Sequence, residues 1–176
     1  MRSLAFFIAF SASLFSACLG GGTGLDSVHA EIVEEHATVA QISPEAFADL
    51  ETDNLLILDI REPEEYAVSR IPGAIWVSPN ATAETATIQI GDVTDKQIIV
   101  YCSVGRRSSI FAERVQADML ANGATSVSNL ERGIFGWHNE SRPLIDANGT
   151  TDAVHPYDAF WKRYVRRKSL AVYQAQ

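Results

Sequence analysis

The sequence predicts an α/β fold with a central parallel sheet and helices on both faces. Three observations lead to this fold class. Short apolar runs rich in Leu, Ile and Val, such as those at 55–60 and 98–101, alternate with segments whose apolar residues recur at helical spacing. These runs lack polar alternation, which is typical of strands buried on both faces of a parallel sheet. Strands that alternate with helices favour parallel order, and 176 residues suffice for one such domain with extensions.

The elements of this fold follow from local start and stop signals. Ser43 and Pro44 begin a helix, as N-cap and first residue, and Gly123 ends the longest helix as the residue after its C-cap. Ser108 or Ser109 is expected to cap the start of that longest helix. In chain order we expect a strand at 38–42, a helix from 44, a strand at 55–60, a short helix at 63–69, a strand at 74–77, a polar stretch with one helical turn at 80–95, a central strand at 98–101, a helix to 122 and a strand at 126–129.

The central strand ends abruptly at Cys102, and a tight loop and a helix follow. The amino end of a helix carries unpaired N–H groups and a partial positive charge, so it favours an anion such as a thiolate. Arg106 and Arg107 add positive charge beside the sulfur. Active sites of parallel sheets lie at the carboxyl ends of the strands, where Asp59 and Arg61 also fall. This placement predicts that Cys102 is an activated sulfur nucleophile.

Four sequence motifs, in order between residues 38 and 143, resemble those of the rhodanese-like sulfurtransferases. The resembling stretches are Asp59-Ile60-Arg61, then Glu64-Glu65-Tyr66 with Arg70-Ile71-Pro72-Gly73-Ala74, then the cysteine loop from Cys102 to Ser108, and last Leu130-Glu131-Arg132-Gly133-Ile134-Phe135-Gly136-Trp137. Arg70 and Arg132 depart from the family pattern, which usually has His and Gly at these two places. Both departures change the charge near the site and bear on the choice of sulfur acceptor. The resemblance implies the same α/β fold, independently of the hydrophobic pattern.

The resemblance also implies a chemistry and a set of site residues. The Cys102 thiolate would take the outer sulfur of an anionic donor, thiosulfate or polysulfide, and pass it from a persulfide to cyanide or a thiol, without a cofactor. Backbone N–H groups of the loop would ring the sulfur, and the loop arginines would attract the donor's oxyanion. Asp59, Arg61 and Ser108 are expected to have supporting roles, with Asp59 holding Arg61 by charge-assisted hydrogen bonds. The expected substrate-binding residues are Ser103, Val104, Gly105, Arg106 and Arg107.

Two other functions fit parts of this pattern. Cysteine enzymes of phosphoryl or arsenate chemistry resemble a Cys-x5-Arg pattern, but counting from Cys102 places Ser108 at the arginine position and Arg107 one residue early. The smaller loop suits a sulfur atom better than a phosphate group. The alternative from another class is a rhodanese-like module that binds a partner without catalysis. Inactive relatives usually lack the cysteine, which this chain retains.

The amino end has the composition of an export signal. A short basic start precedes an apolar run at 4–15, which is too short to span a bilayer. The residues before Cys18 resemble a bacterial lipobox, so residues 1–17 are expected to be a signal peptide and Cys18 a lipidated first mature residue. Ordinary signal cleavage, near Cys18 or after Ala30, is the alternative. Both routes predict an exported protein of the bacterial periplasm, which lipidation would anchor to the membrane.

Two segments are expected to flank a domain at 38–144. A flexible linker occupies 18–37, and a C-terminal extension occupies 145–176. The extension is expected to contain an amphipathic helix at 156–172. This helix either packs on its own domain or rests its basic face, near Arg166 to Lys168, on an anionic membrane surface.

Composition argues against several classes of partner and site. The net charge of −8 argues against nucleic acid as a partner. Cys18 and Cys102 are the two cysteines of the chain, so no disulfide framework is expected. The four histidines are scattered without metal-ligand spacing, so no metal site is expected.

Overall fold

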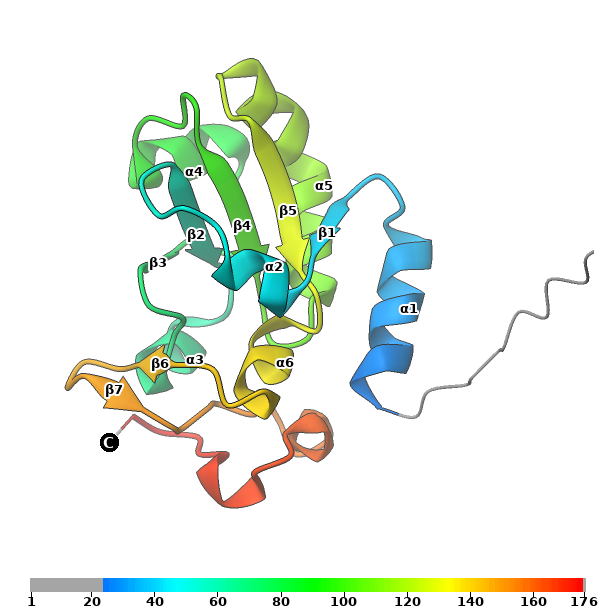
Figure 1. Cartoon of the computed structure of the whole chain (residues 1–176), viewed down its shortest axis with the longest axis vertical. Helices are drawn as coiled ribbons and strands as arrows, with labels where there is room; N and C mark the ends of the chain where they lie inside the picture. Colours follow the sequence, from blue (N-terminus) through cyan, green and yellow to red (C-terminus); the bar gives the residue numbers. More distant parts are fainter. Residues whose placement is uncertain (1–23, 176) are drawn as a thin grey trace, which may run out of the picture.

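The computed structural model of the chain describes residues 24–175 and places five strands of that part in one parallel sheet. The strand order is β1-β5-β4-β2-β3, so β4 lies at the centre (Figure 1). This arrangement confirms the predicted fold class. The strands are β1 (Ala40–Ile42), β2 (Leu55–Asp59), β3 (Ala74–Trp76), β4 (Gln97–Tyr101) and β5 (Ser126–Leu130).

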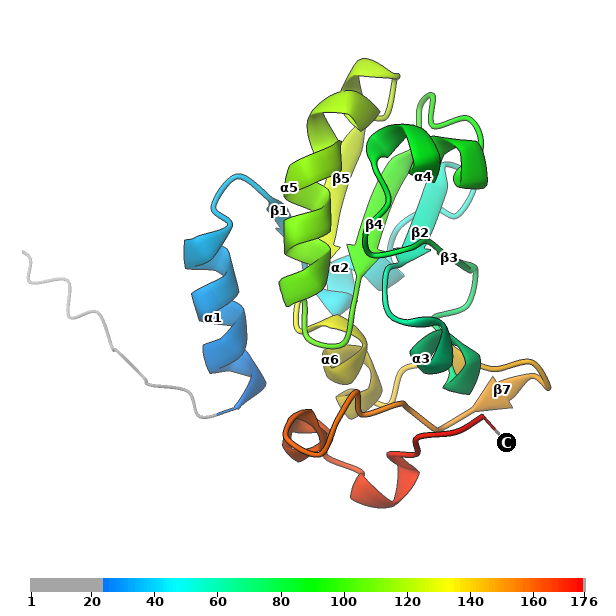
Figure 2. The ribbon, with the colours of Figure 1, turned by 180° about the vertical axis from the view of Figure 1, so that it is seen from behind.

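Helices cover both faces of this sheet (Figures 1 and 2). Alternate residues of β4 enter two separate cores, because successive side chains of a strand point to opposite faces. One core contains the buried side chains of α4 (Ala83–Ile90) and α5 (Arg106–Ala121), and α3 (Pro63–Val68) lies near the carboxyl end of the sheet. The other core contains those of α1 (Leu25–Glu35), α2 (Pro44–Ala48) and α6 (Gly133–Asn139).

The two predicted N-caps, at Ser43 and at Ser108 or Ser109, have different outcomes. Ser43 caps α2 as predicted, because its hydroxyl accepts the N–H of Ala46 at 3.2 Å. The expectation that Ser108 or Ser109 caps α5 is wrong, since α5 begins at Arg106 directly after Gly105. Both serines lie inside the helix and are fully buried. The chain becomes helical early because Gly105 adopts a left-handed conformation, with φ of 102°, that turns it sharply out of the strand.

The expected flexible linker is wrong for residues 25–35, which form α1. Val28 and Ile32 are four residues apart, so they share one face of the helix and are buried in the core. The acidic side chains of α1 obscured this short apolar stripe in the sequence. The predicted signal peptide at 1–17 and the lipidation candidate Cys18 lie outside the described residues and stay predictions, as do the domain boundaries.

The expected amphipathic helix at 156–172 is also wrong. After a small antiparallel pair, β6 (Leu144–Ile145) and β7 (Thr150–Thr151), the chain forms only two short 3₁₀ helices, η1 (Trp161–Tyr164) and η2 (Lys168–Leu170). Tertiary bonds replace helical ones: the N–H of Val154 donates to the carbonyl of Leu170 at 2.9 Å. We call residues 152–173 the C-terminal strap, which crosses the carboxyl end of the sheet (Figure 1).

Membrane contact by the strap stays a prediction, now without the helix that suggested it. Across residues 24–175, no helix is both long and apolar enough to cross a bilayer.

Candidate active site

Cys102 is the first residue beyond β4, at the carboxyl end of the central strand. Its thiol is free and only 1% of the residue is exposed. The N–H of Gly105 donates to Sγ at 3.2 Å, which is one of the backbone contacts expected around the sulfur. Ser103 and Val104 are also buried, so the loop packs tightly over the strand end. A negative charge on this sulfur is therefore stabilised by the backbone at the start of α5.

The first turn of α6 fixes the backbone of the cysteine loop. The N–H of Ile134 donates to the carbonyl of Cys102 at 2.9 Å, and that of Phe135 donates to the carbonyl of Ser103 at 3.0 Å. Gly133 makes this approach possible, because a Cβ built at this position would lie 2.4 Å from the Cys102 oxygen. The sequence marked Gly133 only as part of a motif, since nothing local shows what its missing side chain leaves room for.

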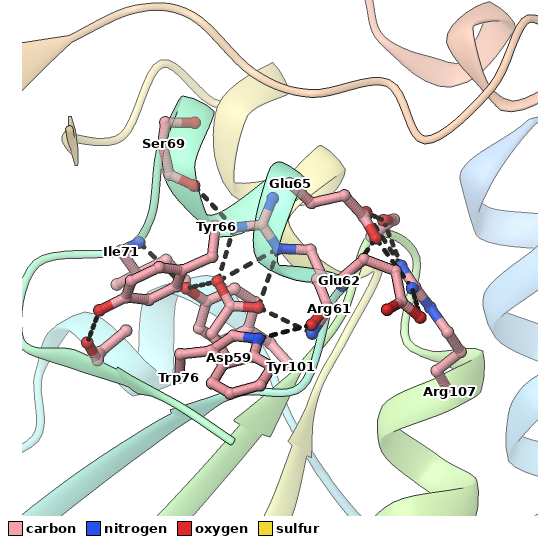
Figure 3. Close-up of polar contacts among 12 residues, drawn as sticks. Asp59, Arg61, Glu62, Glu65, Tyr66, Ser69, Ile71, Trp76, Tyr101 and Arg107 are labelled. Atoms are coloured by element: carbon pink, nitrogen blue, oxygen red, sulfur yellow. Dashed lines mark hydrogen bonds and ion pairs between the residues drawn. The ribbon is translucent and has the colours of Figure 1, made fainter. Parts of the chain in front are cut away.

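A buried carboxylate organises the other side of the loop (Figure 3). Glu65 of α3 accepts two hydrogen bonds from the guanidinium of Arg107, at 2.8 and 2.9 Å, and one from the hydroxyl of Ser103 at 2.6 Å. Burial alone would raise the pKa of Glu65, but the hydrogen bonds and charge of Arg107 lower it below its ordinary value. Glu65 is thus a charged anchor of the loop that the sequence showed only as a motif residue.

Arg107 is held firmly by these contacts. It also donates to the Ser103 hydroxyl at 2.9 Å, which closes a triangle with Glu65. Burial would lower the pKa of Arg107, but the charges of Cys102 and Glu65 outweigh this effect. The pKa of Arg107 is therefore raised above its ordinary value. The guanidinium therefore contributes positive charge near the sulfur while its bidentate face is occupied by a carboxylate.

Asp59 and Arg61 form a second buried pair, at the end of β2 (Figure 3). The Arg61 Nε donates to both oxygens of Asp59, at 2.9 and 3.1 Å, so the expected hydrogen bonds are present. Arg61 also donates to the carbonyl of Ser69 at 2.6 Å, and the hydroxyl of Tyr101 donates to Asp59 at 2.7 Å. Burial is the main cause that raises the pKa of Tyr101 well above its ordinary value, and the charge of Asp59 adds to it. This network ties β2 to the last residue of β4, directly before Cys102.

The other supporting candidate, Ser108, joins α5 to the sheet. Its hydroxyl donates to Oδ1 of the buried Asn129 at 2.6 Å, and the Asn129 amide donates to Gln41 at 2.8 Å. A Cβ at Gly105 would approach the same amide to 3.1 Å, so Asn129 also limits the loop. No sequence signal distinguished Asn129, because a single Asn in a strand forms no motif or spacing pattern.

Arg106 points to the amino-terminal helix. Its guanidinium makes an ion pair with Glu35 and a second one with Glu31 at 3.3 Å. Both loop arginines thus already have carboxylate partners, and an oxyanion would have to compete with them.

A pocket of about 180 Å³ opens at the cysteine. Two of its lining residues, Tyr157 and Trp161, come from the C-terminal strap, and no sequence motif indicated that either would line the site. Two larger surface hollows, of about 610 and 630 Å³, contain none of residues 102–107. The remaining lining residues of the small pocket are Cys102, Ser103, Val104, Arg106 and Arg107.

The two positions that depart from the family pattern lie outside this pocket lining. Arg70 stacks on the ring of Tyr66, with its Cζ 4.8 Å from the ring centre, and donates to the carbonyl of Asp146 at 3.1 Å. Arg132 makes ion pairs with Asp26 at 3.6 Å and with Glu140 at 3.0 Å. Both arginines therefore attach the domain to its flanking segments, and their effect on acceptor choice stays a prediction.

Comparison with known proteins places these features in a family. The family model for the rhodanese-like domain matches residues 43–140. A sulfurtransferase of Allochromatium vinosum is 28% identical over 100 residues, which is 56% of this chain and 86% of that protein. The thiosulfate sulfurtransferase GlpE of Actinobacillus succinogenes is 28% identical over 110 residues, which is 62% of this chain and 93% of that protein.

Solved structures show the same fold. A thiosulfate sulfurtransferase from Pseudomonas aeruginosa matches with a TM-score of 0.55 and 21% identity, over 82% of this chain and 27% of that one. The BH2092 protein from Bacillus halodurans matches with a TM-score of 0.51 and 21% identity, over 70% of this chain and 88% of that one. Since the family model covers more than half of the sequence, the chain belongs to the rhodanese-like domain family.

Proposed function

We propose that the protein is a sulfurtransferase that moves sulfane sulfur from thiosulfate or polysulfide to cyanide or a thiol. The observation that carries the proposal is the buried thiol of Cys102, which accepts the Gly105 N–H and lies on a pocket of about 180 Å³. The two curated relatives named above are sulfurtransferases, and the one from Actinobacillus succinogenes is described as a thiosulfate sulfurtransferase. Both the site and the relatives support this reaction class.

The reaction has two balanced steps. The Cys102 thiolate attacks the outer sulfur of thiosulfate, an S–S bond forms to Cys102, and the S–S bond of the donor breaks to release sulfite. Cyanide or a thiolate then attacks the outer sulfur of the persulfide and leaves as thiocyanate or a new persulfide, while Cys102 departs as a thiolate. The charge stays on sulfur throughout, so the N–H of Gly105 and the nearby charge of Arg107 stabilise both forms of the cysteine.

The contacts of Arg107 argue against the phosphoryl or arsenate alternative. That chemistry requires the loop arginine to face a tetrahedral oxyanion, whereas the guanidinium here binds Glu65 and Ser103. The non-catalytic alternative is disfavoured by the cysteine itself, since a module that only binds a partner has no need for a thiol beneath a backbone N–H.

Mass spectrometry tests the proposal directly. Incubation with thiosulfate or polysulfide should leave the full-length protein one sulfur atom heavier, and added cyanide should remove the sulfur as thiocyanate. Cys102→Ser should abolish both results, and Cys18→Ser, which leaves the site intact, should abolish neither. Turnover of thiosulfate by Cys102→Ser would contradict the proposed nucleophile.

We further propose that the protein is exported and anchored through a lipidated Cys18, with the domain at 38–144 held away from the membrane. The apolar run at 4–15 and the residues before Cys18 support this location. Expressed with its native leader in a bacterial host, the protein should fractionate with membranes, and Cys18→Ser should become soluble in the periplasm or stay unprocessed. A soluble wild-type protein with a mature amino end beyond Cys18 would reject lipidation.

A further inference from the structure

We infer that Tyr157 and Trp161 form an aromatic wall of the active site that selects thiol acceptors with an apolar, uncharged body. Both residues line the Cys102 pocket, and both lie outside the residues that the family model matches. The inference rests on the proposed function, because it concerns the second step of that reaction.

The wall is fixed in place by bonds between the C-terminal strap and the domain. The Asn139 side chain of α6 donates to the carbonyl of Tyr164 at 2.8 Å and accepts the N–H of Arg166 at 2.7 Å. Val165, between them, is completely buried. The strap residue Trp161 also packs against the core that contains α6. The strap is therefore a built part of the domain and holds its aromatic residues at a set position.

Tyr157 adopts a backbone conformation that side chains rarely accept. Its φ is 65°, in the left-handed region, and its N–H donates to Nδ1 of His155 at 3.0 Å. Burial lowers the pKa of His155, which favours the neutral ring, whose Nδ1 can accept this bond. The conformation brings the Tyr157 ring to Arg107, whose Cζ lies 4.7 Å from the ring centre. Backbone strain of this kind tends to occur where function requires a side chain in one position.

The charges around the pocket point to the acceptor class. The Arg106 guanidinium is paired with Glu31 and Glu35, and that of Arg107 with Glu65 and, at 4.0 Å, with Glu62. These carboxylates pair with both guanidiniums but do not line the pocket. A negative charge on the body of an acceptor would have to compete with them for the guanidiniums, whereas an apolar chain would pack on the aromatic wall and on the nearby Val104.

The step selected in this way is transfer from the persulfide. A thiolate R–S⁻ attacks the outer sulfur of Cys102–S–SH, a new S–S bond forms, and the bond to the Cys102 sulfur breaks. The products are R–S–SH and the Cys102 thiolate, so atoms and charge balance without an oxidant. The body R lies against Tyr157 and Trp161 during the attack.

Single-turnover transfer to matched thiols tests the inference. The full chain is loaded with polysulfide, freed of excess reagent, and mixed with 1-propanethiol or with 2-mercaptoethanesulfonate, which has a charged body. Tyr157→Ala should slow transfer to propanethiol about tenfold and transfer to the sulfonate less than twofold, and cyanide should react at the wild-type rate. Tyr157→Phe should behave as wild type, because the ring is kept.

Matched controls separate the wall from the stability of the strap. Phe160→Ala removes an exposed ring beside Trp161 that does not line the pocket, so it should leave the ratio of the two rates unchanged. Trp161→Ala should lower the ratio of the propanethiol rate to the sulfonate rate, as Tyr157→Ala does. Trp161 is half-buried, so its replacement could also destabilise the strap. Tyr157 is exposed, so Tyr157→Ala tests the inference independently of that effect. Unchanged ratios in both wall variants, with the persulfide formed, would overturn this inference alone. A wild-type protein that never gains sulfur would overturn the proposed function as well.

Discussion

Replacing Glu65 by Gln should both destabilise the domain and disturb the cysteine loop. Glu65 accepts hydrogen bonds from Arg107, from the Ser103 hydroxyl and, at 3.1 Å, from the N–H of Glu62. Gln keeps the shape and one acceptor oxygen, but it turns an amide NH₂ toward the Arg107 guanidinium. Two donors then face each other in a site where the Glu65 side chain is only 2% exposed.

The expected loss follows from the burial of the two partners. Removing one partner of a fully buried ion pair costs about 3–5 kcal/mol. The Arg107 side chain is 26% exposed, so water relieves part of that cost and we expect a loss of about 2–3 kcal/mol in the free energy of unfolding. With a urea m-value of about 1–3 kcal/mol per molar, the midpoint should fall by about 0.7–3 M.

The difference should depend on pH. The folded-state pKa of Glu65 is lowered, so its charge stabilises the protein above the unfolded-state value of about 4.3 and this contribution disappears as pH falls through the folded value. The gap in stability between wild type and Glu65→Gln should therefore be complete at pH 7 and narrow below about pH 4.5. Other carboxylates titrate in both proteins alike, so the comparison isolates Glu65.

Urea unfolding followed by tryptophan fluorescence measures this effect, with thiocyanate formation as the activity assay. The matched control is Glu64→Gln, an exposed residue of the same helix, which should unfold and react as wild type. We expect Glu65→Gln to lose at least about tenfold in kcat/KM, because release of Arg107 and Ser103 frees the loop. Equal midpoints for Glu65→Gln and wild type at pH 7, with full activity, would refute the anchoring role.

Three further changes test the loop from other directions. Gly133→Ala places a methyl group against the Cys102 carbonyl and should cost about 2–4 kcal/mol in thermal unfolding and most of the activity; a wild-type melting curve would argue against the close approach. Ser108→Ala leaves the buried Asn129 oxygen without its donor and should cost about 1–3 kcal/mol in urea unfolding, whereas no loss would mean that another donor replaces it. Arg106→Ala should weaken use of thiosulfate by about tenfold to a hundredfold and use of an uncharged sulfane donor less, in steady-state assays; equal losses would mean that Arg106 shapes the loop.

The sheet and the cysteine loop were predictable because local and global signals agree in them. The central strand has no polar alternation, and Gly105 follows Cys102 closely enough to allow a tight loop before the next helix. This strand–loop–helix order places the thiol at the end of the strand, facing the start of the helix. Parallel strands then bring Asp59 and Cys102 to the same edge, although they are far apart in the chain. Periodicity and topology together therefore predicted where this chemistry lies.

The partners of the loop were not predictable, because they depend on distances between elements. Glu65 is one of several acidic residues at a helix start, and only the fold shows that it faces Arg107. Asn129 and Gly133 have no local signal for the groups that they approach. A sequence pattern identifies a face or an end of an element, whereas a buried hydrogen-bond network requires the packing of several elements.

The predictions for the two flanking segments, α1 and the strap, were wrong for a related reason. Both segments contribute to the site. The apolar residues of the strap match a helical spacing, but its backbone groups bond to one another across the strap and to the Asn139 side chain of α6, which removes the need for an α-helix. The stripe of α1 is too short to stand out among its acidic residues. Both segments reach the cysteine loop, α1 through the ion pairs of Arg106 and the strap through Tyr157 and Trp161. Since the family model ends before the strap and begins after α1, the matched domain provides the nucleophile, and the two flanking segments outside the match contribute to the charge and shape that surround it.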